Sequence, residues 1–232
     1  MFDYLRDPQE IYAKSFATIE AEAELARFSE NERPIAIRII HACGMVEMAD
    51  QIAFGGDVAS TATAALRAGK PILCDAEMVR HGIISRLLPT ENEVLCTLND
   101  SDTHGLAAKL ATTRSAAAVE GWNDHIDGAI IAIGNAPTAL FHLLEAIHDG
   151  RMAKPAVIIG MPVGFVGAAE SKEALIVHAN GIPFVTLRGR FGGSAVTAAT
   201  VNALARMARD DGSTPYGNLV RKKGGLSFMN NP

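Results

Sequence analysis

The chain has 232 residues, 48% of them hydrophobic and 20% charged, which is ordinary globular composition and a length that suits one large α/β domain. Its net charge is −5, and no basic block precedes the last dozen residues, which argues against general nucleic-acid binding. The N-terminus has no apolar core of signal-peptide length, no run is long enough to span a membrane, and Cys43, Cys74 and Cys96 form no CxxC pair. We therefore expect a cytoplasmic protein that binds neither nucleic acid nor membrane and has no zinc site or disulfide.

Two helices are predicted at the start of the chain. Residues 8–27 carry apolar side chains at helical spacing and begin with a proline, which suits a first helical turn. A second helix is predicted over about residues 34–50, and apolar side chains project from most of its circumference. A helix that is apolar nearly all round is typically buried. We therefore expect the polar side chains of this second helix to meet internal partners or a ligand.

The second helix contains the segment IRIIHACGM at residues 37–45. Arg38 and His41 lie three residues apart in it, so they share one face of the helix. One interpretation is structural, with a core histidine bonded to a backbone carbonyl and Arg38 paired with an acid such as Glu22. The other is functional, with both side chains directed at a ligand.

The rest of the chain repeats one pattern, a short apolar run followed by a turn and then a helical pattern. Repeated units of this kind predict an α/β fold with a mainly parallel sheet and helices on both faces. We expect a single domain over residues 1–206 and a flexible tail over 207–232, where no periodicity is found. The five predicted units lie at residues 71–83, 93–120, 128–147, 155–177 and 182–207.

Three of the predicted strands end in glycine-rich segments, IGNAPT, IGMPVGFVG and RGRFGGS. The chain has no GxGxxG after its first strand and no GxxxxGK[ST], which argues against a nucleotide site. One interpretation is that the glycines only allow close packing of helices on strands. The other is a ligand platform at the carboxyl edge of the sheet, where helix N-termini with Asn135, Thr138 and Ser194 favour carboxylates. Three such loops at one edge favour an anionic ligand.

Long segments along the chain match one known family in order. They are DYLRDPQEIYAKSF, IRIIHACGMVE, GKPILCDAEMVRHGI, NEVLCTLND, TTRSAAAVE, AIIAIGNAPTALFHLLE, IIGMPVGFVGAAESKEAL and IPFVTLRGRFGGSAVTAATVNALA. On these segments the chain resembles the precorrin-8X methylmutase family of cobalamin biosynthesis, from its N-terminus to about residue 206. After HGI, where the family usually has a polar–basic pair, this chain has Ile84, Ser85 and Arg86, so contacts there are expected to differ.

The resemblance implies an isomerase that moves a methyl group from C-11 to C-12 of precorrin-8X, or of its cobalt form, to give hydrogenobyrinic acid or cobyrinic acid. It also implies a three-layer α/β domain that works as a homodimer with the active site at the subunit interface. His41 of the HACG motif matches the presumed acid, and Ser15, Arg38 and Arg114 match substrate-contact positions. The migration is intramolecular, so we expect neither a cofactor nor a catalytic metal.

Alternatives remain at the level of residues and of function. Ser15 has the structural alternative of bonding back to a helix carbonyl, and Arg114 that of a surface cation. For the whole chain, one alternative is a non-catalytic corrinoid binding or delivery protein with the same fold. Another is an unrelated α/β enzyme that acts on small carboxylic acids.

Overall fold

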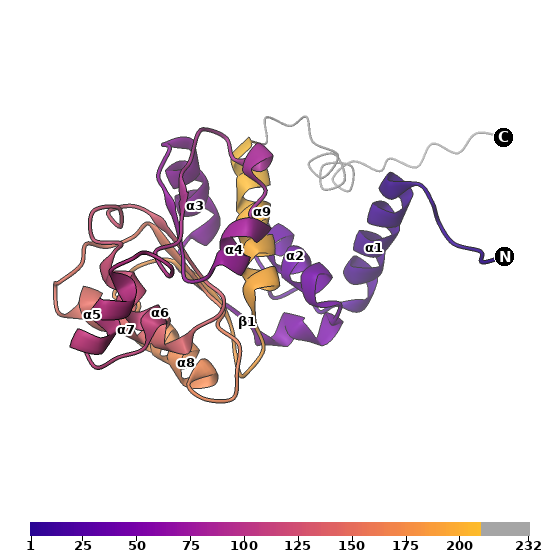
Figure 1. The fold of residues 1–232 in the computed structure, drawn as a ribbon. Coiled ribbons are helices and arrows are strands. Elements are labelled where there is room, and N and C mark those ends of the chain that lie inside the picture. Colours follow the sequence, from indigo (N-terminus) through magenta and orange to yellow (C-terminus); the bar gives the residue numbers. More distant parts are fainter. Residues whose placement is uncertain (210–232) are drawn as a thin grey trace, which may run out of the picture.

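The structure, a computed structural model, describes residues 1–209 (Figure 1). The prediction of a flexible tail falls largely outside these residues. Each of the five predicted units contains a strand and at least one helix. They are β2 (Ile72–Cys74) with α4 (Glu77–Gly82), β3 (Val94–Leu95) with α5 (Thr103–Lys109) and α6 (Arg114–Glu120), β4 (Ile130–Ile133) with α7 (Pro137–His148), β5 (Val157–Gly160) with α8 (Ala168–His178), and β6 (Phe184–Leu187) with α9 (Ser194–Arg209).

A further strand, β1 (Ile52–Gly55), completes a six-stranded sheet of order β1-β6-β5-β4-β2-β3. All neighbouring strands are parallel except β1, which runs antiparallel to β6. The prediction of a mainly parallel sheet is therefore confirmed. Strand β1 was not predicted from the sequence, although a turn and the helix over Val58–Arg67 follow it as in the other units.

The remaining elements lie at the start of the chain or between strands. They are α1 (Pro8–Glu22), α2 (Arg33–Cys43), η1 (Val46–Gln51), α3 (Val58–Arg67) and η2 (Ser85–Leu87). Both predicted N-terminal helices are shorter than expected. The second ends at Gly44, which has a φ of 70° and closes the helix in a left-handed conformation. The chain then continues as the separate 3-10 helix η1.

Two clusters of buried apolar side chains cover the two faces of the sheet. Successive strand residues point to opposite faces, and in β4 Ile130 and Ala132 join one cluster while Ile131 and Ile133 join the other. Helices α2, α3, α4 and α9 cover the first face, and α6, α7 and α8 cover the second. The three-layer architecture is confirmed, and Figure 1 shows α1 outside α2.

The pairing of β1 with β6 brings the first part of the chain to the carboxyl edge of the sheet. Ile52 pairs with Leu187, the last residue of β6, and the Arg188 N–H donates to the Gln51 carbonyl at 2.8 Å. Because η1 ends at Gln51, the chain that follows α2 reaches the edge where the glycine-rich loops begin. The end of α2 that carries His41 therefore approaches this edge.

The last helix extends beyond the predicted domain boundary at residue 206. Ala208 is 5% exposed and joins the core, and its carbonyl accepts a hydrogen bond from Arg67 Nε at 2.8 Å. The packed domain thus continues to the end of α9. None of the helices in residues 1–209 combines the length and apolar character that crossing a bilayer requires.

Candidate active site

Helix α1 presents three side chains on one face towards α2. The helix begins at Pro8, and the Asp7 carboxylate caps it by accepting the N–H groups of Gln9 and Glu10, both at 2.8 Å. Residues at positions i, i+3 and i+4 of a helix lie on one face. The three are Tyr12, Ser15 and Phe16, and each lies against Arg38 or His41 of α2.

The imidazole of His41 is held by two contacts from α1. Its Nδ1 lies 3.0 Å from Ser15 Oγ, a hydrogen-bonding distance, and its ring stacks on Phe16 with centroids 5.0 Å apart and planes inclined by 19°. Ser15 thus bonds the histidine, and the backward bond to a helix carbonyl is made by Thr18 instead. When the hydroxyl donates to Nδ1, the ring proton lies on Nε2, which is then a hydrogen-bond donor.

Arg38 lies against the same aromatic pair. Its guanidinium carbon is 4.8 Å from the ring centre of Tyr12 and 4.9 Å from that of Phe16, both within cation–π range. The pKa of His41 lies below its ordinary value of 6.5, because partial burial and then the positive charge of Arg38 disfavour the imidazolium. The predicted shared face of Arg38 and His41 is confirmed, and it has an electrostatic consequence.

The predicted burial of this face is wrong for His41. Its side chain is exposed and that of Arg38 is half-buried, although the apolar residues around them are buried. The reason is that α1 covers only one flank of α2, and the chain leaves the helix at Gly44, three residues after His41. In the described part of a single chain, the imidazole therefore lies on a surface and can be reached by a ligand.

Neither Tyr12 nor Phe16 was assigned to the site from the sequence. Phe16 is buried in the core, and both rings also contact the polar pair of α2. Their spacing around Ser15 was the available signal. The Tyr12 hydroxyl oxygen is buried and has no hydrogen-bond partner among residues 1–209. A buried hydroxyl of this kind is uncommon in a folded protein.

Arg114 lies elsewhere in the molecule. It is the exposed first residue of α6, whose capping residue Thr113 accepts the Ala116 N–H at 3.1 Å. Helix α6 covers the face of the sheet opposite to α2. The contacts described above around Ser15, Arg38 and His41 do not include Arg114. One chain does not bring the four predicted site residues into one cluster.

The first glycine-rich loop does not offer its N–H groups to a ligand. The Asp75 carboxylate, which is 2% exposed, accepts the N–H groups of Gly134 at 2.9 Å, Asn135 at 2.8 Å and Ala136 at 2.7 Å. The prediction of an external anion at this loop is therefore wrong, because an internal carboxylate occupies the position. Asp75 also fixes the start of α7 rather than that of the next helix, α4. Burial raises its pKa, and the three N–H groups oppose that rise.

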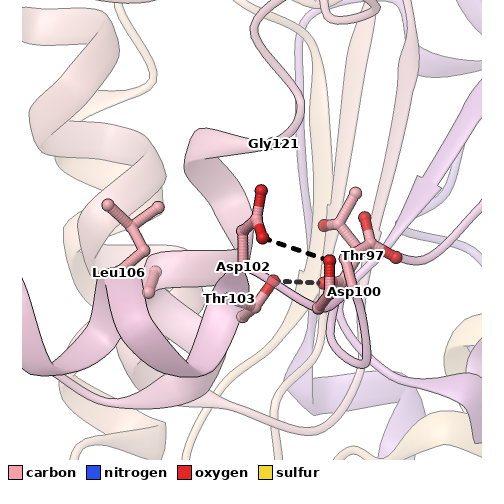
Figure 2. A pocket seen from close by; sticks show the side chains of 8 residues that line it. Thr97, Asp100, Asp102, Thr103, Leu106 and Gly121 are labelled. Carbon is pink, nitrogen blue, oxygen red and sulfur yellow. Dashed lines mark hydrogen bonds between the residues drawn. The ribbon is translucent and has the colours of Figure 1, made fainter.

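A cavity of about 450 Å³ lies between the loop after β3 and helix α6 (Figure 2). Asp100 and Asp102 bring two carboxylates to it, and Ser101 Oγ donates to Asp102 Oδ1 at 3.1 Å. A ligand rich in carboxylates would be repelled here. Within residues 1–209, no group of three or more His, Cys, Asp or Glu side chains is arranged to hold a metal ion. The cluster around His41 remains the better candidate site for an anionic ligand.

The fold and the site define a three-layer α/β protein with an accessible histidine whose ring is held by a serine and a phenylalanine. Residues 10–207 match the family model described as precorrin-8X methylmutase. The chain is 58% identical to "Precorrin-8X methylmutase" of Sinorhizobium sp and 54% identical to the protein of that name from Pseudomonas aeruginosa. These alignments cover 88% of this chain and 97% and 98% of the relatives.

A solved precorrin-8X methyl mutase from Thermus thermophilus has the same fold, with a TM-score of 0.79 and 38% sequence identity. The match covers 89% of this chain and 99% of that chain. The chain belongs to the precorrin-8X methylmutase family. It is therefore an isomerase of the family that moves a methyl group on a tetrapyrrole in cobalamin biosynthesis. The comparisons give no support to a non-catalytic carrier or to an enzyme of small carboxylic acids.

Proposed function

We propose that this chain moves a methyl group from C-11 to C-12 of precorrin-8X, or of its cobalt form, with His41 as the acid. In this proposal Ser15 orients the imidazole, and Arg38 and Arg114 bind peripheral carboxylates of the substrate. The observation that carries the proposal is the 3.0 Å contact between Ser15 Oγ and His41 Nδ1. It fixes the ring of an accessible histidine and leaves Nε2 for the substrate.

The chemistry requires little more than binding and one proton donor. The migrating methyl group stays within one molecule, so no oxidant, reductant or carrier is consumed. As electron density moves through the conjugated macrocycle, Nε2–H donates to a ring nitrogen and stabilises the charge that develops there. A positioned general acid typically contributes about 10²- to 10⁴-fold to the rate. The lowered pKa of His41 favours the neutral ring, whose proton lies on Nε2 when Ser15 donates to Nδ1, and it makes the imidazolium a stronger acid whenever that form is present.

A flat tetrapyrrole edged by carboxylates needs cations near its rim. The net charge of the chain is −5, so long-range attraction is unfavourable and binding has to rely on local donors. Arg38 lies one helical turn from His41 and Arg114 lies on an exposed helix start. Arginine suits this role because its planar guanidinium can bond both oxygens of a carboxylate.

We further propose a homodimer in which His41 of one subunit and Arg114 of the other face the same substrate. The exposure of His41 and the position of Arg114 across the sheet support this arrangement, because a second copy would supply what one chain keeps apart. We expect the reaction to take place in the cytoplasm. The three cysteines are free in the structure, which fits a reducing compartment.

The decisive test is turnover of precorrin-8X, and of its cobalt form, by His41→Ala. We expect a folded protein that binds the tetrapyrrole product and loses at least about 10²-fold in kcat. His41→Asn should do little better, because an amide donates a hydrogen bond but does not transfer a proton. The matched control is His104→Ala, which removes an exposed histidine of α5.

Each outcome separates the candidate functions. Full turnover by His41→Ala would remove the acid role, whereas unfolding of that variant would favour a structural histidine. A wild-type protein that binds the product and never turns over precorrin-8X would be a carrier. Absorbance of the tetrapyrrole reports both binding and conversion, so one instrument measures the wild type and all three variants.

A further inference from the structure

Large apolar side chains lie exposed in two loops at the carboxyl edge of the sheet. Phe165 is 85% exposed and Val166 is 88% exposed, both in the loop between β5 and α8. Phe191, 49% exposed, lies in the loop between β6 and α9. A single exposed apolar residue needs no explanation, but several on neighbouring loops indicate a binding surface.

The two loops are joined through their backbones. The Gly193 N–H donates to the Met161 carbonyl at 2.9 Å, and the Gly164 N–H donates to the Arg190 carbonyl at 3.3 Å. Gly192 has a φ of 155° and passes so close to the Met161 carbonyl that no side chain fits there. Phe165 and Phe191 are therefore presented by one joined surface rather than by two independent loops.

Helix α8 anchors the second loop with two consecutive side chains. Lys172 is fully buried, and its ammonium donates to the Phe191 carbonyl at 2.5 Å. Burial lowers the pKa of Lys172 to about 8, which shows that its position is electrostatically costly. Next to it, both oxygens of Glu173 accept from Arg188 at 2.6 Å. A loop held in this way keeps its exposed aromatic ring in place.

The charges on this surface distinguish its two arginines. Arg188 is already bound to Glu173, so its charge is compensated. Arg190 is exposed, forms no ion pair among the described residues, and lies with its guanidinium 5.2 Å from the ring centre of Phe165. The surface therefore combines an exposed aromatic face with a cation that is available to an anionic partner.

The surface and the His41 cluster approach the same edge of the sheet. The loop that carries Phe191 begins at Arg188, which is bonded to Gln51 at the end of η1. The loop ends where α9 begins, and α9 packs along α2. The two regions are thus joined by direct backbone and helix contacts.

We propose that Phe165, Arg190 and Phe191 form a second contact surface for the tetrapyrrole. The rings cover apolar macrocycle surface, and Arg190 binds a carboxylate at its rim. Lys172 is a positioning residue that holds Phe191 in place. The inference rests on the proposed function and deepens it, because it assigns residues that select a flat, carboxylate-edged macrocycle. A second copy of the chain is the other occupant that an apolar surface can take, and the available charge of Arg190 favours the anionic ligand.

The test is an absorbance titration of the full chain with hydrogenobyrinic acid. We expect Phe165→Ala and Arg190→Ala each to raise Kd by about tenfold. The matched controls are Val177→Ala, an exposed apolar residue on α8, and Lys109→Ala, an exposed cation on α5. Both controls should keep the wild-type Kd.

A second set of titrations, with chemically modified product, isolates the role of Arg190. Converting peripheral carboxylates of the product into amides should weaken binding to the wild type more than to Arg190→Ala, because the variant has already lost the contact. For Lys172→Met we expect a raised KM with kcat nearly unchanged, whereas a merely structural role would change the thermal stability and leave KM as it is.

The outcomes keep the two proposals apart. A wild-type protein that neither binds nor converts the tetrapyrrole removes the proposed function and this inference with it. Normal wild-type turnover with Phe165→Ala and Arg190→Ala equal to their controls overturns the second surface alone. Sedimentation in which Phe165→Ala turns a dimer into a monomer while Kd stays equal to that of the wild type would also overturn it, since the surface would then serve the subunit contact and not the ligand.

Discussion

The positive charge of Arg38 acts on the imidazole of His41, one turn further along α2. It helps to hold the pKa of His41 below 6.5, with partial burial as the larger cause. Arg38→Gln should therefore move this pKa upward towards its ordinary value, as measured by NMR titration of the histidine ring protons. Arg33→Gln, an exposed position at the other end of α2, is the control. An unchanged titration of His41 in Arg38→Gln would contradict the electrostatic coupling.

The same shift has a consequence for stability. Because the folded pKa of His41 lies below the unfolded value, the neutral ring favours folding, and this contribution is present above pH 6.5. It is lost as the pH falls through the folded pKa, since the folded state then binds its proton less readily than the unfolded chain. We expect Arg38→Gln to show a smaller loss of stability over this interval than the wild type in urea unfolding at a series of pH values.

The hydroxyl of Tyr12 makes no hydrogen bond within the described chain. Replacing it by hydrogen in Tyr12→Phe should leave the free energy of unfolding unchanged or raise it by up to about 1 kcal/mol, because a buried unpaired polar group is removed. The ring, which contacts Phe16 and Arg38, is kept. Urea unfolding measures the effect, and Tyr12→Ala, which also loses the ring, should be clearly destabilised. A loss of more than about 1 kcal/mol in Tyr12→Phe would show that the hydroxyl has a partner.

Arg114 is expected to act in binding alone. If it clamps a carboxylate equally in the ground and transition states, Arg114→Ala raises KM and leaves kcat nearly unchanged. Steady-state kinetics with precorrin-8X measures the two constants, with Lys109→Ala as an exposed-cation control on the neighbouring helix. A variant with normal KM and reduced kcat would contradict the clamp.

At the scale of elements, one carboxylate joins two neighbouring strands. Asp75 follows β2 and accepts three N–H groups from the loop after β4. Asp75→Asn replaces an acceptor oxygen by an amide that faces donors, so it should cost about 1.5–3 kcal/mol of stability in urea unfolding. Asp57→Asn is the control, because an exposed capping aspartate can be replaced by asparagine with little loss. If both variants lost the same amount of stability relative to the wild type, the three hydrogen bonds to the Asp75 carboxylate would contribute nothing specific.

The predictions of helices and strands succeeded where the pattern was local. The five strand–helix units were predicted because each strand is a short apolar run and each helix a periodic one. The ends of α1 and α2 were less well predicted, because Gly44 can lie inside a helix or close it, and only its φ decides. The β1 strand was missed, since its partner β6 lies more than a hundred residues away in the sequence.

At the scale of the whole molecule, the proposed shared site predicts complementation between two impaired variants, one in kcat and one in KM. Mixing His41→Ala with Arg114→Ala subunits should produce hybrid dimers in which one site keeps both residues. At a substrate concentration well below the KM of Arg114→Ala, we expect the mixture to be more active than the mean of the two variants. Sedimentation must show that subunits exchange. A mixture that equals the mean after exchange would mean that each site belongs to a single chain.

The sequence alone determined the fold class, the family and the shared face of Arg38 and His41, because these follow from local periodicity and from residues in order along the chain. The tertiary structure decided the rest. It placed Ser15 on the imidazole, left His41 exposed, put Arg114 across the sheet and filled the first glycine-rich loop with Asp75. Each of these depends on which distant segments pack together, and on which donors are already bonded, which no local pattern specifies.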